Sequence, residues 1–214
     1  MLFIGGAMGS DHNGGDPAPI WAAAQIAMVP GHLLFLVVVL LTVTGEYATG
    51  AIRSSLQWVP RRGVLLAARV LVPIAFATAC AVVVSASTNL VAWGFLGRAA
   101  EVAPADVAAS LGRIALVVAF SCAVTAGLGL LLRSTAGTLA AIFLLVLALP
   151  IALGNSGVDW LIAISDHLPG RAIISMLVVD EVELTSGTVA TVMISWTIAA
   201  LVAGGWSLIR RDTT

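Results

Sequence analysis

Residues 114–132 read IALVVAFSCAVTAGLGLLL, an uncharged run enclosed by Arg113 and Arg133. An α-helix needs roughly 20 apolar residues to cross a bilayer, so this run is long enough for one span. Similar uncharged runs cover residues 17–45, 70–97, 134–158 and 184–209. Their apolar residues are consecutive rather than alternating, which favours helices over the strands of an outer-membrane barrel.

The composition agrees with a membrane protein. Hydrophobic residues make up 60% of the chain and charged residues 10%, and the mean hydropathy is +1.07. These values lie outside the range of ordinary soluble domains. The sequence therefore predicts an all-α, polytopic membrane helix bundle in a single domain. We expect five spans at about residues 20–44, 64–96, 108–132, 135–154 and 186–209.

The arginines predict the orientation of the spans, because positively charged loops are retained in the cytoplasm. Arginines follow the first, third and fifth spans: Arg53, Arg61, Arg62, Arg69, Arg133, Arg210 and Arg211. Nine acidic residues and only Arg98, Arg113 and Arg171 lie at the opposite ends. We therefore expect an external N-terminus and a cytoplasmic C-terminus.

Several chemistries find no support in the sequence. The chain has no lysine, which rules out a P-loop of the form G-x-x-x-x-G-K-[ST]. Its three histidines, His12, His32 and His167, form no zinc-binding pair, so no metal site is predicted. No aspartate falls inside a predicted span, so an intramembrane enzyme is only weakly supported. Cys80 and Cys122 lie in predicted spans and are expected to pack as small apolar residues.

The polar segment after the first span carries the most informative pattern. Residues 45–69 read GEYATGAIRSSLQWVPRRGVLLAAR. A short helix along the inner membrane face would place Tyr47 and Trp58 at the headgroups, and Arg61 and Arg62 toward anionic lipid or a protein. A simple interfacial anchor is the alternative explanation of this pattern. Glu46 favours a functional contact over a simple anchor, because a carboxylate so close to the membrane core must be solvated or paired.

This segment resembles the one that follows the second transmembrane helix in ABC-2-type transporter permeases of actinobacteria. There the typical pattern is G-E-Y-x-x-G-x-I-R-x-[ST]-L-x-x-x-P-R-R. Residues 127–140, GLGLLLRSTAGTLA, resemble the junction of the fourth and fifth helices of that family. The ending WSLIRRD, residues 206–212, resembles its usual C-terminus. Together the resemblance covers nearly the whole chain.

The resemblance implies a permease subunit of an exporter in the bacterial plasma membrane. Two such subunits, identical or different, would form a dimer in the lipid bilayer. Separate ABC ATP-binding subunits would bind ATP and Mg²⁺ and hydrolyse ATP, so this chain itself would be no enzyme and hold no cofactor. No nucleic acid is expected among its partners. The coupling segment, residues 45–62, would contact the ATPase through Glu46, Tyr47, Arg53, Trp58, Arg61 and Arg62, with Arg133 as a secondary contact.

One feature departs from the family pattern. Its members have six spans preceded by a basic amphipathic elbow helix, whereas this chain shows five spans and a short apolar remnant at residues 1–8. The elbow helix and most of the first transmembrane helix are therefore expected to be missing. A membrane scaffold, a regulatory subunit or a truncated permease remnant is the alternative function.

Other polar residues offer weaker candidates. Asn89, Ser121 and Thr125 could line a transport pathway, although serine and threonine also bond to their own helix backbone. Gly127 and Gly129 allow helices to approach closely. In the external segment, residues 155–184, the break from Asp166 to Gly170 predicts two short helices or re-entrant pieces. The substrate does not follow from these residues.

Overall fold

The computed structural model describes residues 20–49, 62–96, 104–177 and 185–211, and all of its regular structure is helical. This confirms the predicted all-α fold class for that part of the chain. In chain order the elements are α2 (Ile20–Thr49), α4 (Arg62–Leu96), α5 (Pro104–Leu132), α6 (Thr135–Ile142), the π-helix η2 (Phe143–Ala148), α7 (Leu149–Gly154), α8 (Asp159–Asp166), α9 (Pro169–Leu177) and α10 (Ser186–Arg211).

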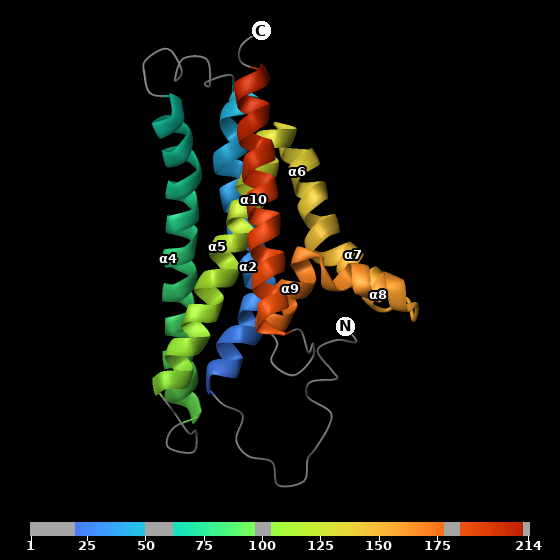
Figure 1. The fold of residues 1–214 in the computed structure, drawn as a ribbon. Helices are drawn as coiled ribbons and strands as arrows, with labels where there is room; N and C mark the ends of the chain where they lie inside the picture. Colours follow the sequence, from blue (N-terminus) through green and yellow to red (C-terminus); the bar gives the residue numbers. More distant parts are fainter. Residues whose placement is uncertain (1–19, 50–61, 97–103, 178–184, 212–214) are drawn as a thin grey trace.

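The four long helices α2, α4, α5 and α10 lie side by side (Figure 1). Helix α5 is their centre, since it contacts α2, α4 and α10 and also α6 and α9. In its apolar span 61% of an 18-residue window is buried, against 22% in the span of α4 and 28% in that of α10. Side chains such as Ile114, Val117 and Cys122 are fully enclosed. The uncharged run of residues 114–132 therefore forms the core of the bundle.

Two glycines let the neighbours of α5 approach it closely. A Cβ atom built on Gly127 would lie 2.5 Å from the backbone carbon of Ala200 on α10. A Cβ on Gly129 would lie 3.3 Å from side-chain atoms of Val43 and Thr44 on α2. Without a hydrophobic effect between lipid-immersed helices, small residues stabilise association by permitting tight packing. The close approach predicted for Gly127 and Gly129 is confirmed.

The fourth predicted span is composite. Helix α6, the π-helix η2 and α7 follow one another without a break from Thr135 to Gly154, and they lean away from the bundle in Figure 1. The π-helix ends just before Pro150, which has no N–H to donate to a preceding carbonyl. Gly170 of α9 packs directly on the Val146 carbonyl, where a Cβ would collide with it. Proline and this backbone contact together give a physical reason for irregular helix at this point.

Two short helices, α8 and α9, follow beside the lower half of the bundle in Figure 1, as the break at residues 166–170 predicts. The Ser165 hydroxyl donates to the Pro150 carbonyl at 3.0 Å and so holds the end of α8 against α7. Trp196 of α10 donates its indole N–H to the His167 carbonyl at 2.9 Å. These two bonds attach the α8–α9 corner to both neighbouring helices.

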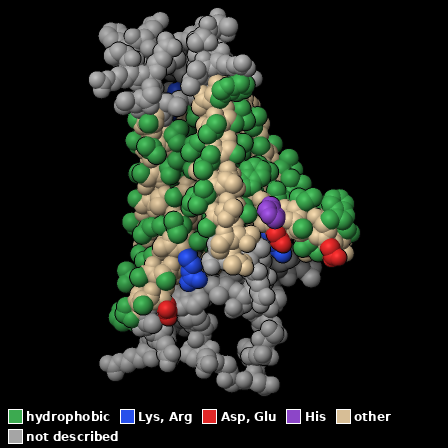
Figure 2. All heavy atoms as spheres, in the orientation of Figure 1, with side chains coloured by type: hydrophobic (Ala, Val, Ile, Leu, Met, Phe, Trp, Pro, Cys, Tyr) green, Lys and Arg blue, Asp and Glu red, His purple; other side chains and the backbone are tan. Residues whose placement is uncertain are grey.

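Within the described part of the chain, four helical stretches are long and apolar enough to cross a membrane: Ala67–Val91, Pro104–Leu132, Thr135–Gly154 and Gly187–Ser207. Helix α2 has 30 residues, of which the described apolar part covers Gly31–Gly45, so the first predicted span stays a prediction. Large apolar side chains point outward, as Figure 2 shows for one face. Leu34, Phe76 and Val202 are examples with about two thirds of their surface exposed. Such a surface suits lipid better than water.

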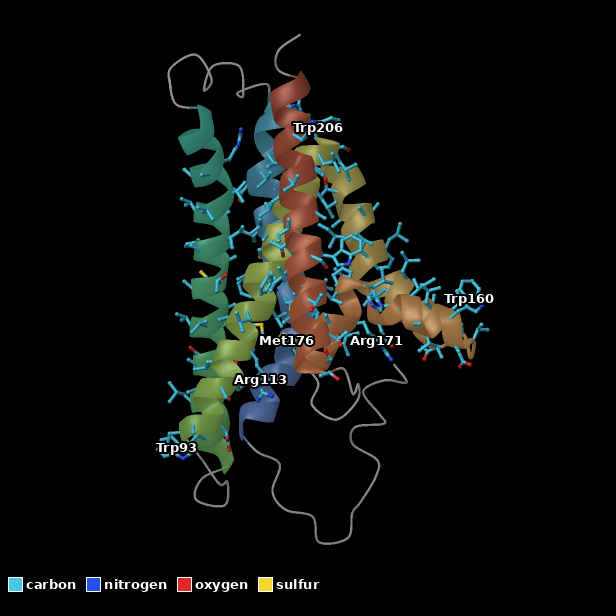
Figure 3. The ribbon with its side chains drawn as sticks, viewed as in Figure 1. Trp93, Arg113, Trp160, Arg171, Met176 and Trp206 are labelled. Carbon is cyan, nitrogen blue, oxygen red and sulfur yellow. The ribbon has the colours of Figure 1, made fainter. Side chains whose placement is uncertain are left out.

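Charged and aromatic residues mark the two ends of the bundle. Arg113 and Arg133 are twenty positions apart along α5 and its following turn, which corresponds to roughly 30 Å at helical rise and to about the thickness of the hydrocarbon core. The exposed side chain of Trp206 lies toward the Arg133 end, and that of Trp93 toward the other (Figure 3). Tryptophan is enriched at membrane interfaces.

Candidate functional site

The end of the bundle that the arginines predict to be cytoplasmic is here called the arginine end. There α2 ends at Thr49, α4 begins at Arg62, the turn around Arg133 joins α5 to α6, and α10 ends at Arg211 (Figure 1). The helix ends that carry the arginines predicted to face the cytoplasm therefore lie together at one end of the bundle. Asp106 lies near the start of α5, at the opposite end of the bundle, and Asp159 and Asp166 belong to α8, which lies away from the arginine end in Figure 1. Glu46, near the end of α2, is the acidic residue that the described helices place at the arginine end.

A tight turn of two residues joins α5 to α6. Arg133 has a φ of 51°, a left-handed conformation that favours glycine. Ser134 then caps α6, because its hydroxyl oxygen accepts the Gly137 N–H at 3.2 Å. Thr138 donates both its N–H and its hydroxyl to the Ser134 carbonyl, at 2.9 and 2.8 Å. The capping residues explain why a new helix starts immediately after the chain reverses.

The Arg133 side chain reaches from this turn to α10. Its Nη2 atom donates to the Ser207 carbonyl at 3.4 Å, near the C-terminal end of that helix. A cation is favourable there, because helix C-termini carry partial negative charge. Glycine would fit the backbone at this position with less strain but could not make this contact.

A hydroxyl pair links α2 to α6 at the same end. The Oγ1 atoms of Thr44 and Thr135 lie 2.9 Å apart. The Thr44 hydroxyl also lies 2.8 Å from the Leu40 carbonyl, which can only accept. Since a hydroxyl has one proton, Thr44 donates to Leu40 and accepts the hydroxyl proton of Thr135. Thr44 is fully buried and Thr135 is half-buried, so the bond lies at the edge of the packed interior.

The coupling segment predicted for residues 45–62 overlaps two of these helices. Helix α2 continues through Thr49, so Glu46 and Tyr47 belong to the same helix as Thr44 and follow it within one turn. Arg62 is the first residue of α4. Arg53, Trp58 and Arg61 lie outside the described residues, and the contacts expected for them stay predictions. Glu46 and Tyr47 thus lie in the same helix as the Thr44–Thr135 bond, close to its C-terminal end.

The three residues predicted to line a transport pathway, Asn89, Ser121 and Thr125, do not line the same cavity. Ser121 and Thr125 both line a small cavity of about 20 Å³ between α5, η2, α9 and α10. Thr125 donates its hydroxyl to the Ser121 carbonyl at 2.8 Å, a bond within its own helix. The Ser121 hydroxyl is buried and has no hydrogen-bond partner among the described residues. Asn89 lies on α4, which does not line this cavity. The cavity has room for about one water molecule.

Three features near the arginine end and the Ser121 cavity were not predicted from the sequence. They are the Thr44–Thr135 bond, the contact from Arg133 to Ser207, and the π-helix beside the Ser121 cavity. The Ser134-Thr135 pair after Arg133 is a local signal for a helix cap. The partners on α2 and α10 lie 91 and 74 residues away and leave no such local signal.

Comparison with known proteins returned no match: no protein-family model, no curated protein and no solved structure is similar to this chain.

Proposed function

We propose that this chain is the membrane-spanning permease subunit of an ABC exporter, driven by a separate ATP-binding subunit that docks at the arginine end. The proposal starts from the resemblance of residues 45–62 to the coupling segment of ABC-2-type permeases. It is supported by the helical, membrane-type architecture of the described residues. By the same proposal, the chain lies in a bacterial plasma membrane and pairs with a second permease subunit, identical or different.

The observation that carries the proposal is the set of ties between helices at the arginine end. Thr44 bonds to Thr135 at 2.9 Å, and Arg133 bonds to the Ser207 carbonyl at 3.4 Å. Through the Arg133 turn, α2, α6 and α10 are connected at the level where the coupling segment leaves α2. A push on Glu46 or Tyr47 would therefore act on three helices together. Rigid-body movement of packed helices is a common way to transmit a switch.

Such a movement would bend the composite fourth span at its π-helix. Its upper part, α6, is tied to α2, whereas η2 is a π-helix directly below it. Single π-turns inside α-helices are frequent at functional sites. The Ser121 cavity lies against the same η2 residues, Val146 among them. A shift of α6 would first change the walls of this cavity.

Co-purification tests the proposal. The tagged chain is extracted from membranes of its source organism in detergent, and bound proteins and ATP hydrolysis are measured. We expect an ATP-binding subunit to be retained, and the Glu46→Ala and Arg53→Glu variants to lose the subunit or the coupling of ATP hydrolysis to transport. Arg98→Glu is the matched control, because the same charge reversal falls at the predicted external end.

Each outcome separates the candidate functions. Retention of an ATPase by the native chain and by Arg98→Glu, but not by Arg53→Glu, supports the permease. A native chain that purifies alone favours a scaffold or a truncated permease remnant. Unchanged coupling in both Glu46→Ala and Arg53→Glu contradicts the assignment of residues 45–62 as the ATPase contact.

A further inference from the structure

We propose that the open groove between α5, α9 and α10 binds an anionic phospholipid, with its phosphate at Arg113. The groove has a volume of about 550 Å³, within the range of roughly 300–1,000 Å³ that is usual for ligand sites. Three elements contribute to its walls: Arg113, Leu116 and Phe120 from α5, Ser175 and Met176 from α9, and Val189, Ala190, Met193 and Ile194 from α10.

The chemistry of the walls matches an amphiphile. Seven of the nine lining residues are apolar, and the charged one is the cation Arg113. Arg113 and Met176 face the same groove from α5 and α9, beside the lower part of α10 (Figure 3). Such an arrangement offers a long apolar surface to an acyl chain and a single positive charge to a headgroup.

The depth of Arg113 fits a phospholipid phosphate. Arg113 and Arg133 are twenty residues apart along α5 and its following turn, or roughly one hydrocarbon thickness. When Arg133 is at one interface, Arg113 lies at the other, where phosphates are found. Apolar groove residues such as Phe120 and Met193 then lie at the level of the acyl chains.

Charge complementarity favours an anionic over a zwitterionic lipid. Among the residues that the structure describes, the lining carries one positive charge and no acidic side chain. A guanidinium has five N–H donors, so Arg113 can bind phosphate oxygens in addition to any protein partner. Ser175 already donates its hydroxyl to the Ala172 carbonyl at 2.9 Å, and its oxygen can still accept a proton from a headgroup hydroxyl. A headgroup with hydroxyls and a net negative charge, such as phosphatidylglycerol, satisfies both residues.

Lipid titration of the purified full-length chain tests this site. Native mass spectrometry in detergent would measure binding of phosphatidylglycerol and of phosphatidylcholine with matched acyl chains. We expect one phosphatidylglycerol to bind about tenfold more tightly than phosphatidylcholine, and Arg113→Gln to abolish that preference. Ala190→Trp, which fills the groove, should weaken binding of both lipids.

Matched controls accompany both variants. Arg171→Gln removes an arginine that pairs with Asp166 at 3.2 Å and does not line the groove. Ala199→Trp adds the same bulk at an exposed alanine of α10 outside the groove. Both controls should bind phosphatidylglycerol as the native chain does. If Arg113→Gln does not fold, Arg113→Lys, which keeps the charge, and Ala190→Trp still decide the question.

Three results would overturn the proposal. The first is equal affinity of the native chain for both lipids, which indicates ordinary annular lipid. The second is an unchanged preference in Arg113→Gln. The third is a change of oligomeric state in Ala190→Trp without a change in lipid binding, which assigns the groove to a second copy of the chain. None of these measurements involves an ATPase, so the lipid site and the proposed exporter function can fail independently.

Discussion

The hydroxyl of Thr135 donates to the hydroxyl of Thr44, 2.9 Å away, and so joins the first residue of α6 to the buried Thr44 of α2. The two residues are 91 positions apart in the chain. Because Gly129 of α5 packs against Thr44 as well, the bond lies where three helices meet at the arginine end.

Removing the Thr44–Thr135 bond should weaken the bundle modestly. Thr44→Val and Thr135→Val keep the side-chain shape but lose the hydroxyl, and a double-mutant cycle isolates their interaction. We expect a coupling free energy of roughly 0.6 kcal/mol, and at most about 1.7 kcal/mol, as for other hydrogen bonds between membrane helices. Unfolding in mixed detergent micelles measures it.

Thr42→Val is the matched control for this cycle. Thr42 lies on the same helix and bonds only to the Val38 carbonyl of that helix, at 2.7 Å. It should show no coupling with Thr135→Val. Equal coupling of Thr42 and Thr44 to Thr135 would mean that the hydroxyl pair does not hold these helices together.

Alanine at two glycines of α5 should have opposite effects. At Gly127 the new Cβ would lie 2.5 Å from the α10 backbone, so the helices must separate, and overpacking of this kind costs roughly 1–3 kcal/mol. At Gly112 a Cβ meets nothing within 4 Å, and alanine gains helix propensity of up to about 1 kcal/mol. Thermal unfolding midpoints in detergent compare the two variants. A stable Gly127→Ala protein would show that α5 and α10 are less closely packed than described.

Glycine at position 133 should separate backbone strain from side-chain contact. The left-handed conformation of Arg133 costs a non-glycine residue roughly 1–2 kcal/mol, whereas its bond to Ser207 is long at 3.4 Å and correspondingly weak. Arg133→Gly should therefore be at least as stable as the native chain, and Arg133→Ala about 1 kcal/mol less stable than Arg133→Gly. If the proposed coupling role is right, both variants lose ATPase coupling. If a stable Arg133→Gly protein keeps native ATPase coupling, the Arg133 side chain does not take part in coupling.

Cysteine labelling should determine which end faces the cytoplasm. Ser134→Cys places a thiol at an exposed position of the arginine end, and Asn155→Cys places one at an exposed position after α7. A membrane-impermeant maleimide applied to intact cells should label Asn155→Cys only, and both variants after permeabilisation. The native chain is the control, with Cys122 buried and Cys80 partly buried inside helices. The reverse labelling pattern would invert the topology and contradict the proposed docking side.

Much of the fold could be predicted because membrane insertion is decided locally. A helix satisfies its own backbone hydrogen bonds in lipid, so an uncharged run of sufficient length predicts a helix without reference to the rest of the chain. Residues 114–132 and 134–158 show this, as does the break at residues 166–170 between α8 and α9. The π-helix within the fourth span was not predicted, because Val146 meets Gly170 only after the chain has turned back.

The sequence by itself determined the helical class and the membrane-type surface, because length and hydropathy act residue by residue. Only the tertiary structure decided that α5 is central, that Thr135 bonds to Thr44, and that Ser121 faces a cavity which α4 does not line. It also decided that Arg113 opens onto an apolar groove. These relationships depend on which faces of distant helices meet, and helix packing chooses those faces through the positions of small residues such as Gly127 and Gly129.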